Sequence, residues 1–211
     1  MGIVAQEVLD TDIPRACEME VAAYANNPAS PVLFPGPFPP DSGEKRVNGL
    51  IEIRQNDPTV RYMQAVDKQS ADILAFSKWH FYETPEAAAA AERPVNVGAG
   101  TNKAACEAFF DGMAKRKKEI MGDRPHIYLH MLHTDPKFQG RGAGGILLNW
   151  GTQEADKIGL PIYLESSPEA HRFYQKHGFE DIEEFRVDFS QFSKEGKWHI
   201  APLMIRKPGN V

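Results

Sequence analysis

The sequence predicts an α/β fold in which a mixed, mainly antiparallel central sheet is flanked by helices. Segments 60–66 and 73–82 are predicted strands joined by a polar turn, and segments 179–189 and 198–206 form a second such pair. A dense run of apolar and aromatic residues at 126–134 is typical of a central strand, with helical patterns before and after it. Strands and helices interspersed along one chain indicate helices packed on one sheet.

Composition limits the class of protein. The chain has 211 residues and a formal net charge of -5, which fits one domain spanning 1–211 and argues against a general nucleic-acid binder. No apolar run approaches the roughly 18 residues of a membrane helix, and the first residues lack a secretory signal. We therefore expect a cytoplasmic protein that has no membrane partner. Cys17 and Cys106 lie far apart, so we expect them to pack in the core rather than to form a disulfide or do chemistry.

The N-terminal part is predicted to hold one strand and one helix. A short apolar stretch at 3–9 favours a strand. Thr11 or Asp12 is then expected to cap a helix that carries Pro14 in its first turn and runs to about Tyr24.

A proline-rich segment follows at 26–40. Its prolines remove hydrogen-bond donors and fix φ, so no regular element is expected there. The segment also carries Phe34 and Phe38, and two interpretations stay open: packing on the core, or a wall of a ligand site. A second helix is predicted over 42–55.

The middle of the chain is predicted to contain an insertion and a long helix. The insertion, at about 83–102, is rich in Ala, Pro and Gly, and we expect it to be mobile at least in part. The helix covers 103–121, and its basic run KRKKE is typical of a solvated helix face.

The C-terminal part is predicted to hold a buried strand at 161–164 and one further helix. Ser167 is expected to cap this helix, Pro168 suits its first position, and Gly178 suits its C-terminal cap.

The stretch PKFQGRGAGGILL at 136–148 lies between the predicted central strand and a predicted helix at 144–158. A glycine-rich loop that opens a helix can surround an anion with free backbone N–H groups, and Gln139 and Arg141 add donors. The stretch therefore predicts a phosphate site, and its spacing suggests a pyrophosphate.

Two other phosphate-binding motifs fit this loop less well. The Lys-Ser or Lys-Thr of a P-loop does not follow it. Gly140, Gly142 and Gly145 spell the dinucleotide pattern G-x-G-x-x-G, but they follow antiparallel strands rather than an opening strand of a doubly wound sheet. A simple tight turn stays open as well.

Two motifs together resemble the GCN5-related N-acetyltransferase (GNAT) family. Its loop pattern, Gln/Arg-x-x-Gly-x-Gly/Ala, is met by Gln139, Gly142 and Gly144. Some 30 residues on, the family has a helix ending in Phe/Leu-Tyr-x-x-x-Gly-Phe, which is similar to the segment FYQKHGF at 173–179. The resemblance covers about 127–189 and implies a GNAT-like sheet with acetyl-CoA as the co-substrate.

The resemblance also implies roles for individual residues. Tyr174 would lie near the thioester sulfur and act as general acid on the departing thiolate. Ser167 stands where many relatives carry a pantetheine-contacting Asn, so its contact is expected to be weaker or absent. The other implied cofactor-binding residues are Leu132, His133 and Thr134, through their backbone, for pantetheine, and Gln139, Gly140, Arg141, Gly142, Ala143, Gly144 and Gly145 for the pyrophosphate.

Several residues are candidates for the general base. The segment HMLHTDP partly resembles arylalkylamine N-acetyltransferases, in which a catalytic His falls at His130; the alternative is a hydrogen-bonded core histidine. Glu165, on the next strand, is a second candidate for the base or for binding a cationic acceptor. His80 and Trp79 are more easily explained by packing than by lining the acceptor pocket.

These observations favour an acetyl-CoA-dependent N-acetyltransferase of a small primary amine, with no metal. Phe34 and Phe38 would suit an apolar or aryl amine. A protein or peptide N-acetyltransferase and a non-catalytic CoA-binding regulator are the alternatives, and a monomer or homodimer is expected.

Overall fold

A computed structural model describes residues 2–91, 97–194 and 196–209 of the chain. Seven strands form one sheet in the order β1-β2-β3-β4-β5-β7-β6. All neighbouring strands are antiparallel except the parallel pair β4–β5, which confirms the predicted mainly antiparallel sheet. The strands are β1 (Ile3–Glu7), β2 (Val60–Asp67), β3 (Ile73–Tyr82), β4 (His126–Thr134), β5 (Ile162–Glu165), β6 (Glu180–Asp188) and β7 (Trp198–Arg206).

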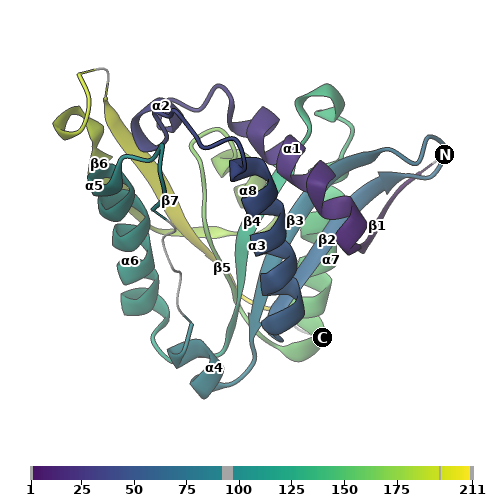
Figure 1. Cartoon of the computed structure of the whole chain (residues 1–211). Helices are drawn as coiled ribbons and strands as arrows, with labels where there is room; N and C mark the ends of the chain where they lie inside the picture. The colour runs from purple at the N-terminus through teal and green to yellow at the C-terminus, as the bar shows by residue number, and fades with distance from the viewer. Residues whose placement is uncertain (1, 92–96, 195, 210–211) are drawn as a thin grey trace.

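Helices cover both faces of this sheet. Helices α1 and α3 lie on one face, together with α6, and α7 lies on the other (Figure 1). The helices are α1 (Ile13–Tyr24), α2 (Ser30–Leu33), α3 (Ser42–Asn56), α4 (Pro85–Ala89), α5 (Lys103–Cys106), α6 (Gly112–Met121), α7 (Ala143–Ile158) and α8 (His171–Lys176). Short 3₁₀ turns lie at Asp10–Asp12, Pro136–Phe138 and Phe189–Gln191, and a π turn lies at Glu107–Asp111.

The alternation of side chains along the strands divides the core into two layers. On the α7 face, Trp79, Ile127 and Leu164 are buried against Leu147 of α7. On the other face, Tyr62 and Phe76 are among the residues that pack against α1 and α3.

The structure corrects several predictions in the N-terminal part. The first strand ends at Glu7, because the chain enters the turn Asp10–Asp12. The carboxylate of Asp12 does not cap α1, because it accepts hydrogen bonds from the Leu9 N–H (3.1 Å) and from Gln64 Nε2 (2.7 Å). The proline-rich segment does contain a regular element, the four-residue α2, in which Pro31 occupies the first turn, where no donor is needed.

The predicted helix over 103–121 is three elements, since a π turn separates α5 from α6. At Gly112, a Cβ would lie 2.5 Å from Cζ of Phe185, so glycine allows α6 to approach β6 closely. The last helix begins at His171 rather than at Pro168, because residues 168–170 form a turn in which Ser167 Oγ accepts from the Ala170 N–H (3.3 Å). Within the predicted insertion, residues 92–96 lie outside the described residues.

Candidate active site

A β-bulge lies in the central strand. Between β3 and β4, Lys78 is opposite Met131 and Trp79 is opposite Leu129, which leaves His130 as the extra residue. Such a bulge bends the strand and places two successive side chains on the same face. The side chain of His130 accordingly lies on the α1/α3 face with Tyr128, and its neighbour Met131 reaches Arg46 of α3 (3.9 Å).

The sheet opens directly after this bulge. Strand β5 pairs with β4 only along 127–129, opposite 162–164. The side chains of β4 are buried up to Leu129 and half-buried from His130 to Leu132. Within the described residues, therefore, the β5-facing edge of 130–134 has no strand partner, and its backbone groups are available to an extended ligand. We call this opening the β4–β5 split.

Side chains with acid–base chemistry gather beside the split on the α1/α3 face. The ring of His130 stacks on Tyr128 at 5.2 Å and lies 5.6 Å from the ring of His80. The hydroxyl of Tyr128 donates to Oε2 of Glu165 at 2.6 Å. The topology thus brings together His130 and Glu165, which the sequence offered as separate candidates for the base.

The Glu165 carboxylate lies among buried tyrosines. Burial raises the pKa of Tyr163 far above its usual range, and the charge of Glu165 raises it further. Lys117 of α6 approaches the Tyr128 ring from the helix side, with Nζ 4.3 Å from the ring centroid. The cation that the structure places on the Tyr128 ring is thus Lys117.

Tyr174 approaches from the opposite face. It is 7% exposed and packs between Phe173 and Phe179, at ring distances of 5.3 and 5.6 Å. Burial raises the pKa of its hydroxyl, and the proximity of Tyr24 raises it further, so Tyr174 is protonated at neutral pH. Tyr174 lies on the α7 face of the sheet, in the apolar cluster that also contains Leu129 and Leu147. Sequence reasoning missed Tyr24, since nothing but an aromatic at a helix end marks it.

The glycine loop has the geometry of an anion cradle. Gly140 and Gly142 have φ of 78° and 84°, a region that glycine enters without a steric penalty. Within the described chain, a Cβ at either position would meet nothing within 4 Å, so each opens onto free space. Gly142 is also the N-cap of the 16-residue α7, whose first N–H groups point out of the helix. These residues fit a pyrophosphate.

Asp135 anchors the start of the loop. Its N–H donates to the Leu74 carbonyl, and its Oδ1 accepts from the Lys137 N–H (2.8 Å). Its other oxygen is paired with Arg15 of α1. Burial alone would raise the pKa of Asp135, but the Lys137 N–H and Arg15 together hold it below its usual range. The carboxylate therefore stays charged and fixes the loop to the sheet and to α1.

Several predicted ligand residues are engaged elsewhere in the fold. Arg141 pairs with Asp67 at the end of β2, and its guanidinium lies 5.6 Å from the Phe138 ring. The side chain of His133 is buried between Phe76 and Tyr24, at ring distances of 5.4 and 6.2 Å, and burial lowers its pKa. The roles expected for the backbone of His133 and for Arg141 remain predictions.

The two phenylalanines of the proline-rich segment pack on neighbouring loops and helices. The Phe34 ring lies 6.3 Å from Phe110, and the Phe38 ring covers Gly100. Both are partly exposed, at 40% and 53%. Phe185 packs against two apolar clusters, one that contains Phe110 and one that contains Tyr163.

The described residues contain no candidate metal cluster and no candidate membrane-spanning helix. No group of three or more His, Cys, Asp or Glu side chains there could hold a metal ion. None of the described helices has the length and apolar character needed to cross a membrane.

Comparisons with known proteins agree with this geometry. A 68-residue stretch is 31% identical to the probable acyltransferase SID5 of Ajellomyces capsulatus, covering 32% of this chain and 50% of that protein. The chain thus matches about half the length of this curated relative.

Solved structures show the same fold. A histone acetyltransferase HPA2 and related acetyltransferase from Corynebacterium glutamicum has a TM-score of 0.63 at 20% identity, covering 100% of this chain and 99% of that one. The mosquito arylalkylamine N-acetyltransferase like 5b also has a TM-score of 0.63, at 16% identity, covering 98% and 100%. At these identities the likeness is one of fold.

The sequence profile described as the "Acetyltransferase (GNAT) family" matches residues 48–179, well over half of the chain and including the bulge, the split and the glycine loop. The chain therefore belongs to the GNAT family of acetyltransferases, whose members use acetyl-CoA as co-substrate.

Proposed function

We propose that the protein is an acetyl-CoA-dependent N-acetyltransferase that acetylates a primary amine of a small molecule. The observation that carries this proposal is the β4–β5 split, which has His130 and Glu165 on its α1/α3 face and the glycine loop after the end of β4. Tyr174 lies in the cluster on the α7 face, and we expect it to reach the split from there. Bound acetyl-CoA would supply the acyl group and a thiolate leaving group. The β4 edge would hold pantetheine through Leu132, His133 and Thr134, and residues 139–145 would hold the pyrophosphate.

The chain's own residues would move two protons. His130 accepts a proton from the acceptor ammonium, because a neutral imidazole is an effective base near neutral pH. Tyr174 stays protonated through burial and gives its proton to the sulfur as negative charge develops there. A backbone N–H of the central strand would donate to the developing oxyanion. This chemistry needs no covalent enzyme intermediate.

Charge and apolar surface support a small, cationic acceptor. The Glu165 carboxylate, held by the Tyr128 hydroxyl, would attract an ammonium group into the split. Phe34 and Phe38, the exposed aromatic residues of the proline-rich segment, would suit an aryl or alkyl tail.

The test is release of free thiol from acetyl-CoA across a panel of arylalkylamines, polyamines, amino sugars, amino acids and peptides. Tyr174→Phe and His130→Gln are each expected to lower kcat by about a hundredfold or more with the preferred amine. The control is Tyr62→Phe, which removes a buried hydroxyl that donates to the Leu50 carbonyl (3.1 Å), away from the split. It should lower stability by about 1 kcal/mol and leave kcat unchanged.

Each outcome has a distinct meaning. Turnover confined to peptides would mean that the acceptor is a peptide or protein rather than a small molecule. Acetyl-CoA binding without turnover on any amine or peptide would indicate a CoA-binding regulator. Equal kcat for wild type and Tyr174→Phe would remove the general-acid role from Tyr174 while leaving the transferase.

A further inference from the structure

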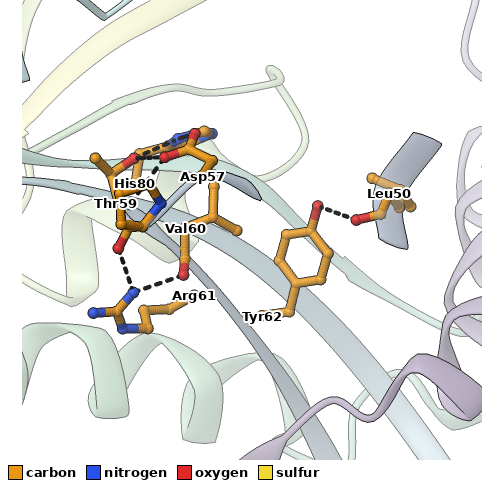
Figure 2. Close-up of polar contacts among 8 residues, drawn as sticks. Leu50, Asp57, Thr59, Val60, Arg61, Tyr62 and His80 are labelled. Atoms are coloured by element: carbon orange, nitrogen blue, oxygen red, sulfur yellow. Dashed lines mark hydrogen bonds and ion pairs between the residues drawn. The ribbon is translucent and has the colours of Figure 1, made fainter. Parts of the chain in front are cut away.

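His80 lies next to the proposed base and has a second set of polar neighbours that leads toward the surface. Its Nδ1 is 3.6 Å from Oδ2 of Asp57 and 3.4 Å from the hydroxyl of Thr59 (Figure 2). Asp57 and Thr59 precede β2, whereas His80 lies in β3. From the sequence, packing was favoured for His80 over lining the acceptor pocket, and nothing in the local sequence connects it to Asp57.

Asp57 is held in place for this contact. Its Oδ1 accepts both the N–H of Thr59 (2.9 Å) and the hydroxyl of Thr59 (2.7 Å). These bonds leave Oδ2 directed at His80. The Asp57 side chain is 36% exposed and that of His80 is 10% exposed, so the pair connects the interior with solvent.

On its inner side, His80 meets His130. The two ring centroids are 5.6 Å apart, tilted by 36°. This centroid spacing leaves the ring nitrogens of His80 and His130 near enough for a proton to pass between them through one water molecule with two hydrogen bonds of about 2.8 Å. The rings of Tyr82 and Tyr128 stack beside His80 at 5.5 and 6.0 Å and hold it in this position.

The charged groups around His80 come from several elements. Asp57 contributes negative charge from the end of α3, and Glu165 of β5 contributes it through the Tyr128 hydroxyl. Lys117 of α6 contributes positive charge behind the Tyr82 and Tyr128 rings, at 5.2 and 4.3 Å from their centroids. Asp57 is the charge in direct contact with His80, so it dominates the local balance.

We propose that His80 and Asp57 form a relay that carries the proton taken up by His130 out to solvent. The inference rests on the proposed function, in which His130 is the base. An acceptor ammonium that becomes an amide loses two protons. One ends on the thiol of CoA through Tyr174, and the other must leave the protein. His130 passes this second proton through one water to His80, whose positive charge Asp57 stabilises, and His80 releases it to solvent at the Asp57 edge.

The experiment compares His80→Gln and Asp57→Asn with wild type and with a control, His126→Gln. His126 lies in β4 on the same face, with its ring 5.2 Å from Tyr82, but it stands outside the path from His130 to Asp57. Thiol release is measured with the preferred amine at low buffer concentration, and again with added imidazole. Unfolding midpoints are recorded for every variant.

For His80→Gln we expect kcat to fall about tenfold at low buffer, less than the loss of the base itself because solvent takes over part of the transfer. Added imidazole should restore most of it, because a small buffer can carry the proton. For Asp57→Asn we expect the acidic limb of the kcat profile to move to lower pH by about one unit, since removing the carboxylate disfavours the protonated relay. Added imidazole should leave kcat unchanged for wild type and for His126→Gln.

Several results would overturn the relay. One is unchanged kcat in His80→Gln while His130→Gln is inactive, which would keep the proposed function and remove the relay alone. Another is a loss that imidazole does not restore and that follows a fall in the unfolding midpoint, which would make His80 a packing residue. If His130→Gln is fully active while His80→Gln shows a buffer-restored loss, His80 would itself be the base. Absence of thiol release by wild type with every acceptor would remove the proposed function and the relay together.

Discussion

Gly142→Ala tests whether the glycine loop holds the pyrophosphate, and Gly159→Ala is its matched control. Both glycines flank α7 in the left-handed region, with φ of 84° at the N-cap and 68° at the C-cap. Within the described chain, a Cβ at either position meets nothing within 4 Å, so neither substitution creates a clash. Each should therefore cost about 1–2 kcal/mol of stability through its backbone conformation alone.

The two variants should differ in acetyl-CoA affinity. At Gly142 the new methyl group would enter the space that the phosphate oxygens need, and the loop would shift its N–H groups. Loss of one or two hydrogen bonds to a charged phosphate, at about 1.5–3 kcal/mol each, corresponds to a weakening of roughly tenfold to 20,000-fold. Titration calorimetry with acetyl-CoA measures this. Wild-type affinity in Gly142→Ala, or an equal loss in Gly159→Ala, would refute the cradle.

Two further predictions concern stability. Burial lowers the pKa of His126 from 6.5 to about 4, so the folded state resists its protonation. The corresponding stability is complete above about pH 6.5 and is lost as pH falls to about 4, a change of roughly 3 kcal/mol. His126→Gln should flatten the pH dependence of the free energy of unfolding by that amount, and parallel curves would contradict the assignment. In α7, Gly151→Ala should destabilise the protein by about 1–3 kcal/mol, because a Cβ would lie 2.2 Å from Cη2 of Trp79. At Gly145 a Cβ would lie 3.8 Å from Nε2 of His177, so Gly145→Ala should stabilise the protein by up to about 1 kcal/mol through helix propensity. Urea denaturation of both variants decides this, and a loss at Gly145 equal to that at Gly151 would contradict the packing argument.

The sequence predicted those features that a local pattern encodes. The strand at 126–134, the glycine loop and the helix that begins near Gly144 all follow from residue types within one short window, and the structure has each of them. Pairings between distant residues escaped prediction. Arg141 pairs with Asp67, 74 residues away, and this contact depends on how the end of β2 meets the loop.

Capping was predicted less well than the elements themselves. Asp12 is a good N-cap residue by type, but its carboxylate binds Gln64 and the Leu9 N–H, which are competing partners that only the folded chain supplies. The π turn at Glu107–Asp111 was not predicted either, and it lies directly before Gly112, where the helix packs closely on Phe185.

The bulge at His130 explains why one strand can serve two sides of a site. Without it, strict alternation would place Met131 on the α7 face and return Leu132 to the side of His130. With it, His130 and Met131 both face α1 and α3, while Leu132 packs in the α7 core and Thr134 lies beside Gly144 of the glycine loop, 3.3 Å from a Cβ placed there. One extra residue thus leaves the proposed base on the α1/α3 face and turns the rest of the strand, so that Leu132 and Thr134 lie on the side of the glycine loop. In the proposed mechanism a single strand would therefore position both the base and the acyl donor.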